Sequence, residues 1–324
     1  MQILIVTPGK RGTPLGNEVT AQRWAKILRH LGHRVKVAAQ FATDQHQKID
    51  CLIALHAFRS SQSIERFQAE CRGRPIIVGL TGTDLNRDMN SSQASIHRPT
   101  RHSLRAADRI VTLEPNARLQ LPTTMRSKCR VIFQSAMALK PRPKKLIRHF
   151  EITMANHLRS EKDPFLAARA VGRLPASSRI KICHIGYALT PAFARRARAE
   201  STKNPRYQWM GGVPHWQSRR RIARSQALLL TSKSEGGPSV FGEAIMNHVP
   251  ILSTRIPTTT GMLEADYPGL FPTSGYRELA DLLQKLETDR LFYRELLSRT
   301  QQLKTRFKPS AERNAWSQLI AELV

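Results

Sequence analysis

Hydrophobic residues in this chain form short continuous runs that alternate with helix-like stretches. Between the first two runs, apolar residues recur at helical spacing from Ala21 to Leu31, and Gly32 ends that helix. Strands that are apolar along their length and alternate with helices indicate a parallel sheet covered on both faces. In the first half, buried strands are expected at 3–6, 35–38, 51–55, 75–80, 109–113 and 130–133, with a second helix at 61–69.

The alternation restarts after a Pro-rich basic stretch. Lys140–Lys145 reads KPRPKK and has no apolar period, so we interpret it as a linker. Near the end, Ser310 is predicted to cap a helix whose apolar stripe, Trp316 to Leu323, must be buried against another element. Beyond the linker, strands are expected at 150–154, 179–185, 207–210, 227–231 and 250–253, and helices at 164–171, 191–200, 240–247 and, in two segments, 279–300.

Two consecutive doubly wound units predict an α/β protein of two facing Rossmann-like domains, with a ligand cleft between them and a C-terminal helix that crosses back. A length of 324 residues fits roughly two domains. The first strand is followed by TPGKRGTPLGN in place of GxGxxG, and GxxxxGK[ST] is absent, which disfavours dinucleotide redox enzymes and P-loop NTPases. The expected boundaries are 1–139 for the first domain, 140–148 for the linker, 149–307 for the second domain and 308–324 for the final helix.

Charge is the unusual feature of the composition. The chain has 52 Lys and Arg against 24 Asp and Glu, a formal net charge of +28, which attracts anionic partners. Nucleic-acid binding is disfavoured because the sequence has neither zinc-finger spacing nor an RNP signature, and only 6% of its residues are aromatic. The four cysteines are far apart, which fits a reduced, cytoplasmic protein, and no apolar run reaches the length of a membrane span.

The segment EGGPSVFGEA, residues 235–244, is the most specific for chemistry. Its glycines let the backbone approach a ligand closely, and the N–H groups at the start of the helix that follows favour a phosphate. The alternative, a Gly-rich loop with a glutamate cap, remains open. The candidates here are Glu235, Gly236, Gly237, Pro238, Ser239 and Glu243.

Glu-x7-Glu, with YxWxG upstream (Tyr207, Trp209, Gly211) and EAIMNHVPIL downstream, resembles the nucleotide-sugar glycosyltransferases of the GT-B fold, in the family 4 group. The resemblance implies that Glu235 lies near the donor sugar and that Glu243 binds the ribose. It also places Trp209 and Gly211 at the donor site.

The segment NHLRSEKDPF matches the donor-diphosphate segment of the same group. The resemblance implies that Arg159 and Lys162 bind the diphosphate, with His157 beside them; surface loop charges are the alternative. Two cations and a helix N-terminus stabilise a departing diphosphate without a metal, so we expect neither a metal nor a cofactor besides the UDP-sugar substrate. Asn156 replaces the usual Gly, and a bulkier loop, PTTTG at 257–261, leaves the donor sugar open.

Blocks in the first half resemble a narrower family, the selenosugar synthases of selenoneine biosynthesis. They are GNEVTAQRWAKILRHLGH, ALHAFRS, GLTGTDLNRD, AADRIVTLEP and VIFQSA, and the later DYPGLFP agrees with them. The resemblance implies that selenophosphate attacks the anomeric carbon of UDP-N-acetylglucosamine or UDP-glucose. The products would be a selenosugar, passed to the next pathway enzyme, and UDP.

Polar residues follow four expected strand ends in the first domain, where ligands collect in parallel sheets. We predict that Arg23 and Arg59 bind the selenophosphate oxyanions and that Asn17 acts in catalysis. The alternatives are a structural turn for Asp84, a core histidine for His56 and a solvated helix residue for Arg23. The predicted acceptor set is Gly16, Thr20, Arg23, His56, Arg59, Thr81, Gly82, Thr83, Asp84, Gln134 and Ser135.

Two further residue groups are interpreted as structural. Trp24 is expected in the core, and the run Arg219–Arg221 is expected on a solvated helix surface. Three other functions compete with the selenosugar synthase: an ordinary glycosyltransferase with a hydroxyl acceptor, a nucleic-acid binder without activity, and a thiosugar synthase.

Overall fold

The computed structural model describes residues 1–8, 16–42, 48–145 and 148–323. Most of the TPGKRGTPLGN turn and the linker residues Leu146 and Ile147 lie outside these ranges. The chain divides into two compact units, Met1–Gln134 with Ser310–Val324 (unit 1) and Ser135–Pro309 (unit 2). Among the described residues, no helix is both long and apolar enough to cross a membrane.

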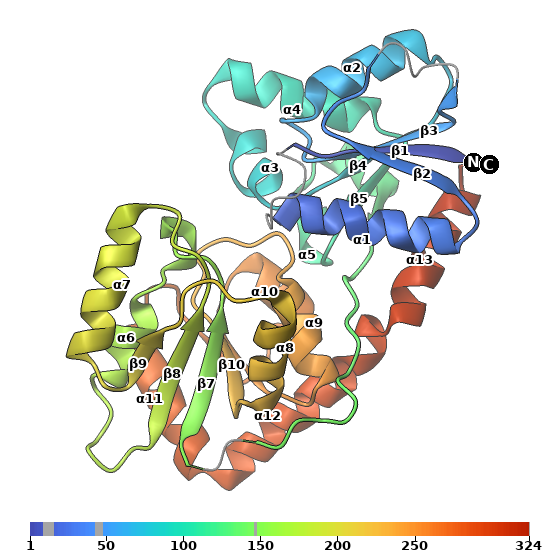
Figure 1. The fold of residues 1–324 in the computed structure, drawn as a ribbon. Helices are drawn as coiled ribbons and strands as arrows, with labels where there is room; N and C mark the ends of the chain where they lie inside the picture. Colours follow the sequence, from blue (N-terminus) through green and yellow to red (C-terminus); the bar gives the residue numbers. More distant parts are fainter. Residues whose placement is uncertain (9–15, 43–47, 146–147, 324) are drawn as a thin grey trace. The chain divides into compact units, whose positions relative to one another are not determined.

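Unit 1 contains a six-stranded parallel sheet in the order β2-β1-β3-β4-β5-β6 (Figure 1). Every neighbouring pair is parallel, and each strand lies within two residues of its expected position, which confirms the reading of the apolar runs. The strands are β1 (Gln2–Val6), β2 (Arg34–Ala38), β3 (Cys51–Leu55), β4 (Ile76–Gly79), β5 (Arg109–Thr112) and β6 (Cys129–Val131).

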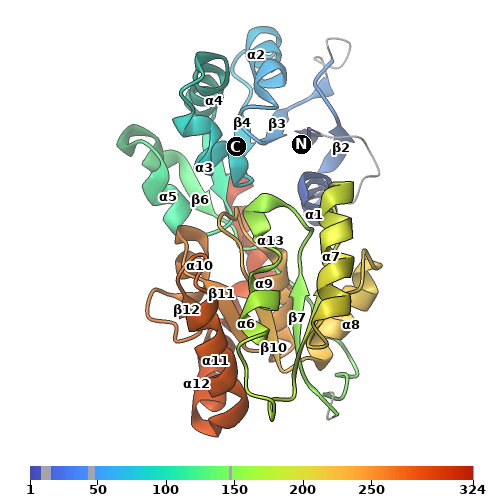
Figure 2. The same ribbon diagram turned by 90° about the vertical axis from the view of Figure 1, so that its left-hand side faces the viewer.

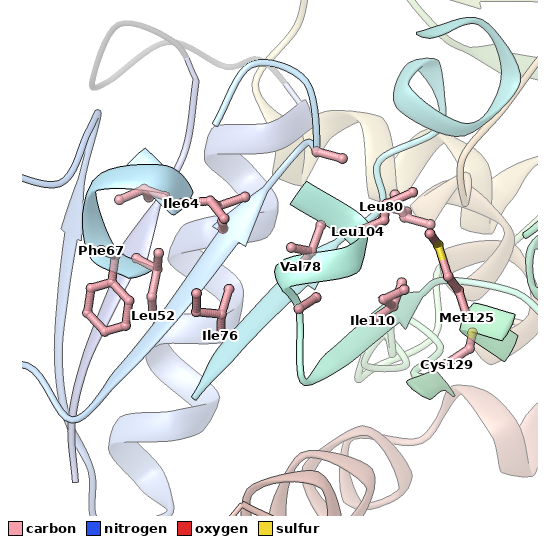
Figure 3. Packing of buried hydrophobic residues seen from close by; sticks show 14 of the residues in the cluster. Leu52, Ile64, Phe67, Ile76, Val78, Leu80, Leu104, Ile110, Met125 and Cys129 are labelled. Atoms are coloured by element: carbon pink, nitrogen blue, oxygen red, sulfur yellow. The ribbon is translucent and has the colours of Figure 1, made fainter. Parts of the chain in front are cut away.

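Helices cover both faces of this sheet. Alternate strand residues such as Leu52 and Val78 face Ile64 and Phe67 of α2 (Ser61–Glu70) and Leu104 of α4 (Ala94–Ala106) (Figure 3). The other face packs against α1 (Gly16–His30) and α13 (Pro309–Ala321). The connections after β4 and β5 hold short helical segments: α3 (Thr83–Asn86), η2 (Asp88–Asn90), α5 (Asn116–Gln120) and η3 (Thr123–Lys128).

The apolar stripe of α13 is buried in unit 1, as predicted. Trp316 is fully buried, and its ring lies 4.8 Å from that of Trp24, which is also fully buried, so the interpretation of Trp24 as a core residue is confirmed. The prediction that Ser310 caps this helix is wrong, because the helix begins at Pro309 and Ser310 lies in its first turn. Residues remote in sequence therefore complete the core of unit 1.

Unit 2 contains a second six-stranded parallel sheet, in the order β12-β11-β10-β7-β8-β9. Five of its strands match the expected runs, and β12 was not foreseen. The helix α8 contacts β7 and α9, all three labelled in Figure 2. The helix α6 contacts β8 and α11. The strands are β7 (Phe150–Ala155), β8 (Ile180–Ile185), β9 (Tyr207–Trp209), β10 (Ala227–Leu230), β11 (Ile251–Thr254) and β12 (Leu270–Phe271).

Two helices of unit 2 differ from the sequence expectation. α8 (His215–Arg224) carries the run Arg219–Arg221, and Arg221 forms an ion pair with the buried Glu151 at 2.6 Å, so this arginine is not merely solvated. The segment PTTTG, expected to be a loop, begins α10 (Pro257–Leu263). The remaining helices are α6 (Leu166–Val171), α7 (Pro191–Lys203), α9 (Ser239–Met246), α11 (Tyr276–Thr288) and α12 (Arg290–Gln302).

The chain crosses between the units twice, after Gln134 and after Pro309. Just inside unit 2 the two crossing segments are joined, since the backbone N–H of Ala136 donates to the carbonyl of Phe307 at 3.0 Å. The segment expected as a linker then follows unit 2: Leu139 N–H donates to Asn247, and Lys145 donates to the carbonyl of Ser225.

Truncation of Trp316 tests the role of α13. Trp316→Ala should lower the free energy of unfolding of unit 1 by about 3–5 kcal/mol, because it leaves a large cavity beside Trp24. The matched control is Trp216→Ala on α8, where the tryptophan is 60% exposed and the expected change is within about 0.5 kcal/mol. Urea unfolding followed by circular dichroism measures both; equal losses would contradict the assignment.

Candidate functional site

The centre of the candidate site in unit 2 is an ion pair between two residues that were predicted from the sequence to bind the donor. Lys162 follows β7 in a short helical turn, η4 (Ser160–Lys162), and its Nζ lies 2.5 Å from Oε1 of Glu235, in the loop between β10 and α9. The side chains are 12% and 8% exposed, so the pair is largely desolvated. Ser232 Oγ also donates to Glu235 Oε1, at 2.5 Å. The structure thus brings together one predicted cation and one predicted carboxylate.

Hydrogen bonds from threonine side chains to backbone carbonyls hold the two loops that carry this pair. Thr231, fully buried at the end of β10, donates through Oγ1 to the carbonyls of Lys162 at 2.8 Å and Asp163 at 3.0 Å. Thr258 of α10 donates to the carbonyl of Glu235 at 2.7 Å. These bonds fix the positions of Lys162 and Glu235 before any ligand is bound.

Two more predicted residues share the connection after β7 with Lys162. The Arg159 side chain is 40% exposed, and its Nε lies 3.9 Å from Glu161, beyond hydrogen-bond distance. His157 accepts a hydrogen bond at Nδ1 from the backbone of Tyr187, at 3.2 Å. Burial, and then the charges of Arg159 and Lys162, lower the pKa of His157, so this imidazole is neutral at pH 7. The local charge therefore comes from Arg159 and Lys162.

A buried histidine that was not predicted from the sequence anchors the start of the connection after β7. His184 of β8 is fully buried; its Nδ1 lies 2.7 Å from the hydroxyl of Tyr207, and its Nε2 lies 2.9 Å from Oδ1 of Asn156. The amide oxygen of Asn156 can only accept, so the tautomer that satisfies both contacts carries its proton on Nε2. Burial lowers the pKa of His184 to about 4. Asn156 thus has a structural partner, and the one signal in the sequence was a lone histidine inside an apolar strand.

Glu243 lies in the first turns of α9. Its Oε1 is 2.7 Å from Nε2 of the mostly exposed His215, while Oε2 is buried without a hydrogen-bond partner in the described part of the chain. Pro238 precedes α9, which begins at Ser239, and with Gly236 and Gly237 these residues form the approach to the helix N-terminus.

Trp209 and Gly211 lie at the end of β9. The indole N–H of Trp209 donates to the carbonyl of Gly186 at 2.9 Å, and its ring packs with Leu158 and Phe165, so its role in the structure is mainly packing. Gly211 has a φ of 70°, a left-handed conformation that favours glycine.

In unit 1, the predicted acceptor residues separate into structural and accessible ones. The fully buried Asp84 accepts hydrogen bonds from the backbone N–H groups of Thr81, Gly82, Leu85 and Ala57, at 2.9–3.1 Å. This engagement favours the structural turn over the predicted contact with the acceptor. Gln134 donates to Thr20 Oγ1 at 3.0 Å, and both are buried. Ser135, the first residue of unit 2, is buried as well.

His56 and Thr83 form a hydrogen-bonded pair at the ends of β3 and β4. His56 is 1% exposed with a φ of 71°, and its Nδ1 accepts from the backbone N–H of Arg59. Its Nε2 lies 3.0 Å from Thr83 Oγ1, so the proton on Nε2 is donated to that hydroxyl. The partly exposed Thr83 hydroxyl accepts this bond, so its own proton can be donated to another group. Arg59, three residues after His56, has an exposed side chain.

Arg23, predicted to bind the acceptor, is engaged by a residue of α13. Its Nε and NH2 donate to both carboxylate oxygens of Glu312 on α13, at 2.5–3.0 Å, and Glu312 is 2% exposed. The arginine therefore compensates a buried carboxylate, which favours a structural role over the predicted contact with the acceptor. Gly16 and Asn17 begin α1, directly after the undescribed segment. Within the described ranges, no three His, Cys, Asp or Glu side chains are grouped to hold a metal ion.

Comparison with known proteins agrees with this architecture. The family model of the "Glycosyl transferases group 1" matches residues 140–304. The chain is similar to the crystal structure of Anabaena HepE in complex with UDP and glucose, with a TM-score of 0.78 and 14% identity over 99% of this chain and 100% of that one.

Two other solved structures are similar over the whole chain. Sucrose-phosphate synthase from Thermosynechococcus elongatus has a TM-score of 0.78 and 12% identity, covering 99% of this chain and 98% of its own. The apo lipopolysaccharide outer core galactosyltransferase WaaB has a TM-score of 0.71 and 15% identity, with both chains fully covered. At these identities the likeness shows the fold, and it confirms the predicted GT-B class.

The low pKa of His184 predicts how stability depends on pH. An unfolded histidine binds its proton near pH 6.5, whereas folded His184 binds it only near pH 4, so stability is lost as pH falls through that window. The expected loss from this group is about 3 kcal/mol between pH 6.5 and pH 4. Urea unfolding of His184→Gln should show a smaller pH dependence over this range than the wild type, and the control His149→Gln should keep the wild-type slope. Identical slopes in all three proteins would refute this origin.

Proposed function

This chain belongs to the group 1 glycosyl transferases, and we propose that it transfers the sugar of a UDP-sugar to a selenophosphate acceptor. The observation that carries the donor half of this proposal is the desolvated Lys162–Glu235 pair beside the N-terminus of α9. A cation and a helix N-terminus at one place suit a diphosphate that gains negative charge as it leaves.

The geometry is consistent with a role for each residue proposed to bind the UDP-sugar. An ammonium has three donors, so Lys162 can bond Glu235 and still donate to phosphate oxygens. The more exposed Arg159 would bind the other side of the diphosphate. Glu243, with one buried oxygen unpartnered in the described chain, is suited to accept a hydrogen bond from a ribose hydroxyl. Glu235 would lie next to the donor sugar.

The choice of UDP rests on the solved relatives. HepE is described in complex with UDP, with UDP-glucose, and with UDP and glucose. The proposal extends that donor class to this chain and leaves the sugar open between glucose and N-acetylglucosamine.

The acceptor proposal rests on the N-terminal blocks that resemble the selenosugar synthases and on the polar strand ends of unit 1. In the proposed step a selenium lone pair of selenophosphate forms the Se–C1 bond while the C1–O bond to UDP breaks, and its electron pair leaves on the β-phosphate oxygen. The products are a sugar selenophosphate and UDP; release of the selenosugar requires a separate hydrolysis of the P–Se bond. The Thr83 hydroxyl and the exposed Arg59 are the proposed oxyanion contacts.

A second candidate is a hydroxyl acceptor on a sugar. Two solved structures of the same fold favour a hydroxyl acceptor. WaaB is described as a lipopolysaccharide outer core galactosyltransferase, and HepE is described in complex with UDP and glucose. The two candidates share the donor site and differ only in the nucleophile.

An acceptor panel decides between them. The protein with UDP-glucose or UDP-N-acetylglucosamine should release UDP when selenophosphate is added, and the product should have the mass of a sugar carrying selenium. Thiophosphate tests the sulfur analogue, and glucose tests the hydroxyl acceptor. UDP release with glucose but not with selenophosphate would leave the donor proposal standing and end the acceptor proposal.

Substitution of Lys162 tests the donor site. Lys162→Met should lower kcat by about 10²–10³-fold, because the departing diphosphate loses a cation in a desolvated site. Glu235→Gln should also lower kcat. The control Lys203→Met removes an equal charge at the exposed end of α7 and should leave the rate unchanged. Steady-state UDP release measures all three variants, and similar rates for Lys162→Met and Lys203→Met would exclude this role.

A further inference from the structure

A cavity of about 400 Å³ lies in unit 1, outside the residues discussed so far. It opens between the connection that follows β4, with η2 and α4, and the connection that follows β5, with α5 and η3. Met89 and Leu121, both members of the buried core beneath, form apolar parts of its wall. The cavity thus lies between the two connections that leave the carboxyl ends of the neighbouring parallel strands β4 and β5.

The charged groups that line this cavity are arginines. Arg101 comes from α4 and Arg126 from η3, His97 of α4 lies beside them, and none of the lining residues is acidic. Neither arginine forms an ion pair with any carboxylate in the part of the chain that the structure describes. An anion in the cavity would therefore meet two guanidinium groups that no described acid neutralises.

Arg126 is held in place by the backbone around the cavity. Its Nε donates to the carbonyl of Leu121 at 2.9 Å, and its NH2 donates to the carbonyl of Leu119 at 2.7 Å. A guanidinium fixed by carbonyls is pre-organised, so little side-chain freedom is lost when it binds a ligand.

Two donors of the lining have no hydrogen-bond partner. Arg101 Nε and Gln120 Nε2 are buried and unpaired within the described residues, and Arg101 NH1 has only the marginal contact with His97 Nε2 at 3.5 Å. A buried hydrogen-bond donor without a partner is unfavourable. A ligand rich in acceptor oxygens would satisfy these two donors if the side chains of Arg101 and Gln120 reoriented toward it.

We propose that this cavity binds the phosphate group of a small molecule, with Arg101 and Arg126 as its principal contacts. Arginine suits phosphate because its planar fork of donors matches two oxygens at once. A volume of about 400 Å³ is within the range of small-molecule sites and exceeds the needs of a bare oxyanion. The apolar wall at Met89 and Leu121 would contact the organic part of a phosphate monoester. None of these residues belongs to the donor or acceptor sets above, so the proposal does not rest on the proposed function.

Titration calorimetry with the full chain at physiological salt tests this site. The probes are inorganic phosphate, thiophosphate, glucose 6-phosphate and UDP. Arg101→Met should weaken the binding of at least one of the first three probes by about tenfold or more, because a charge-assisted contact is lost. The matched control is Arg98→Met, an exposed arginine on the same helix that does not line the cavity; its effect should stay within about twofold.

The probes also distinguish the sources of the phosphate. Binding of inorganic phosphate or thiophosphate alone would identify an oxyanion site, and tighter binding of glucose 6-phosphate would identify a monoester site; either supports the proposal. If Arg101→Met and Arg98→Met weakened probe binding equally, the loss would reflect only the overall positive charge of the protein. That result would overturn the proposal. So would an absence of binding by the first three probes, or a parallel loss of UDP affinity in Arg101→Met. Sugar transfer is not a readout, so failure of the proposed function leaves this result intact.

Discussion

The contact between α1 and α13 is the constraint on which unit 1 depends. Arg23 binds both oxygens of the buried Glu312, and one helical position further on, Trp24 meets Trp316. Removing one partner of a buried ion pair leaves an uncompensated charge, which costs far more than the pair contributes. One face of the sheet in unit 1 is therefore covered completely only while α13, nearly three hundred residues away in sequence, stays attached beside α1.

The parallel sheets explain where the chemistry lies. All strands of a parallel sheet end at the same edge, so loops that follow different strands gather there. In unit 2 this arrangement brings Lys162, after β7, to Glu235, after β10. In unit 1 it joins the connections after β4 and β5 around a cavity lined by basic side chains. Each unit thus assembles its polar groups from segments that are separate in sequence, while the buried strands supply rigidity.

Much of the fold could be predicted because buried parallel strands are continuous apolar runs that need no partner to be recognised. The failures have tertiary causes. PTTTG lacks helix propensity, yet α10 begins there because Thr259 bonds both the N–H of Ile256 and the carbonyl of Thr254. Among the site residues, Lys162 and Glu235 could be found from local motifs. The engagement of Arg23 could not, since Glu312 is 289 positions away and no local pattern connects them.

The order in which the two units acquire their complete cores follows from the two chain crossings. Unit 2 is one continuous stretch, Ser135–Pro309, so all its strands exist as soon as that stretch has been synthesised. Unit 1 begins first but ends last, because Trp316, Leu319 and Ile320 belong to its core. During translation the earliest strands must therefore wait, with one apolar face covered by α1 but not yet by α13, until the ribosome has made the segment beyond residue 309. A nascent chain halted before that point would be a substrate for chaperones that hold exposed apolar sheets.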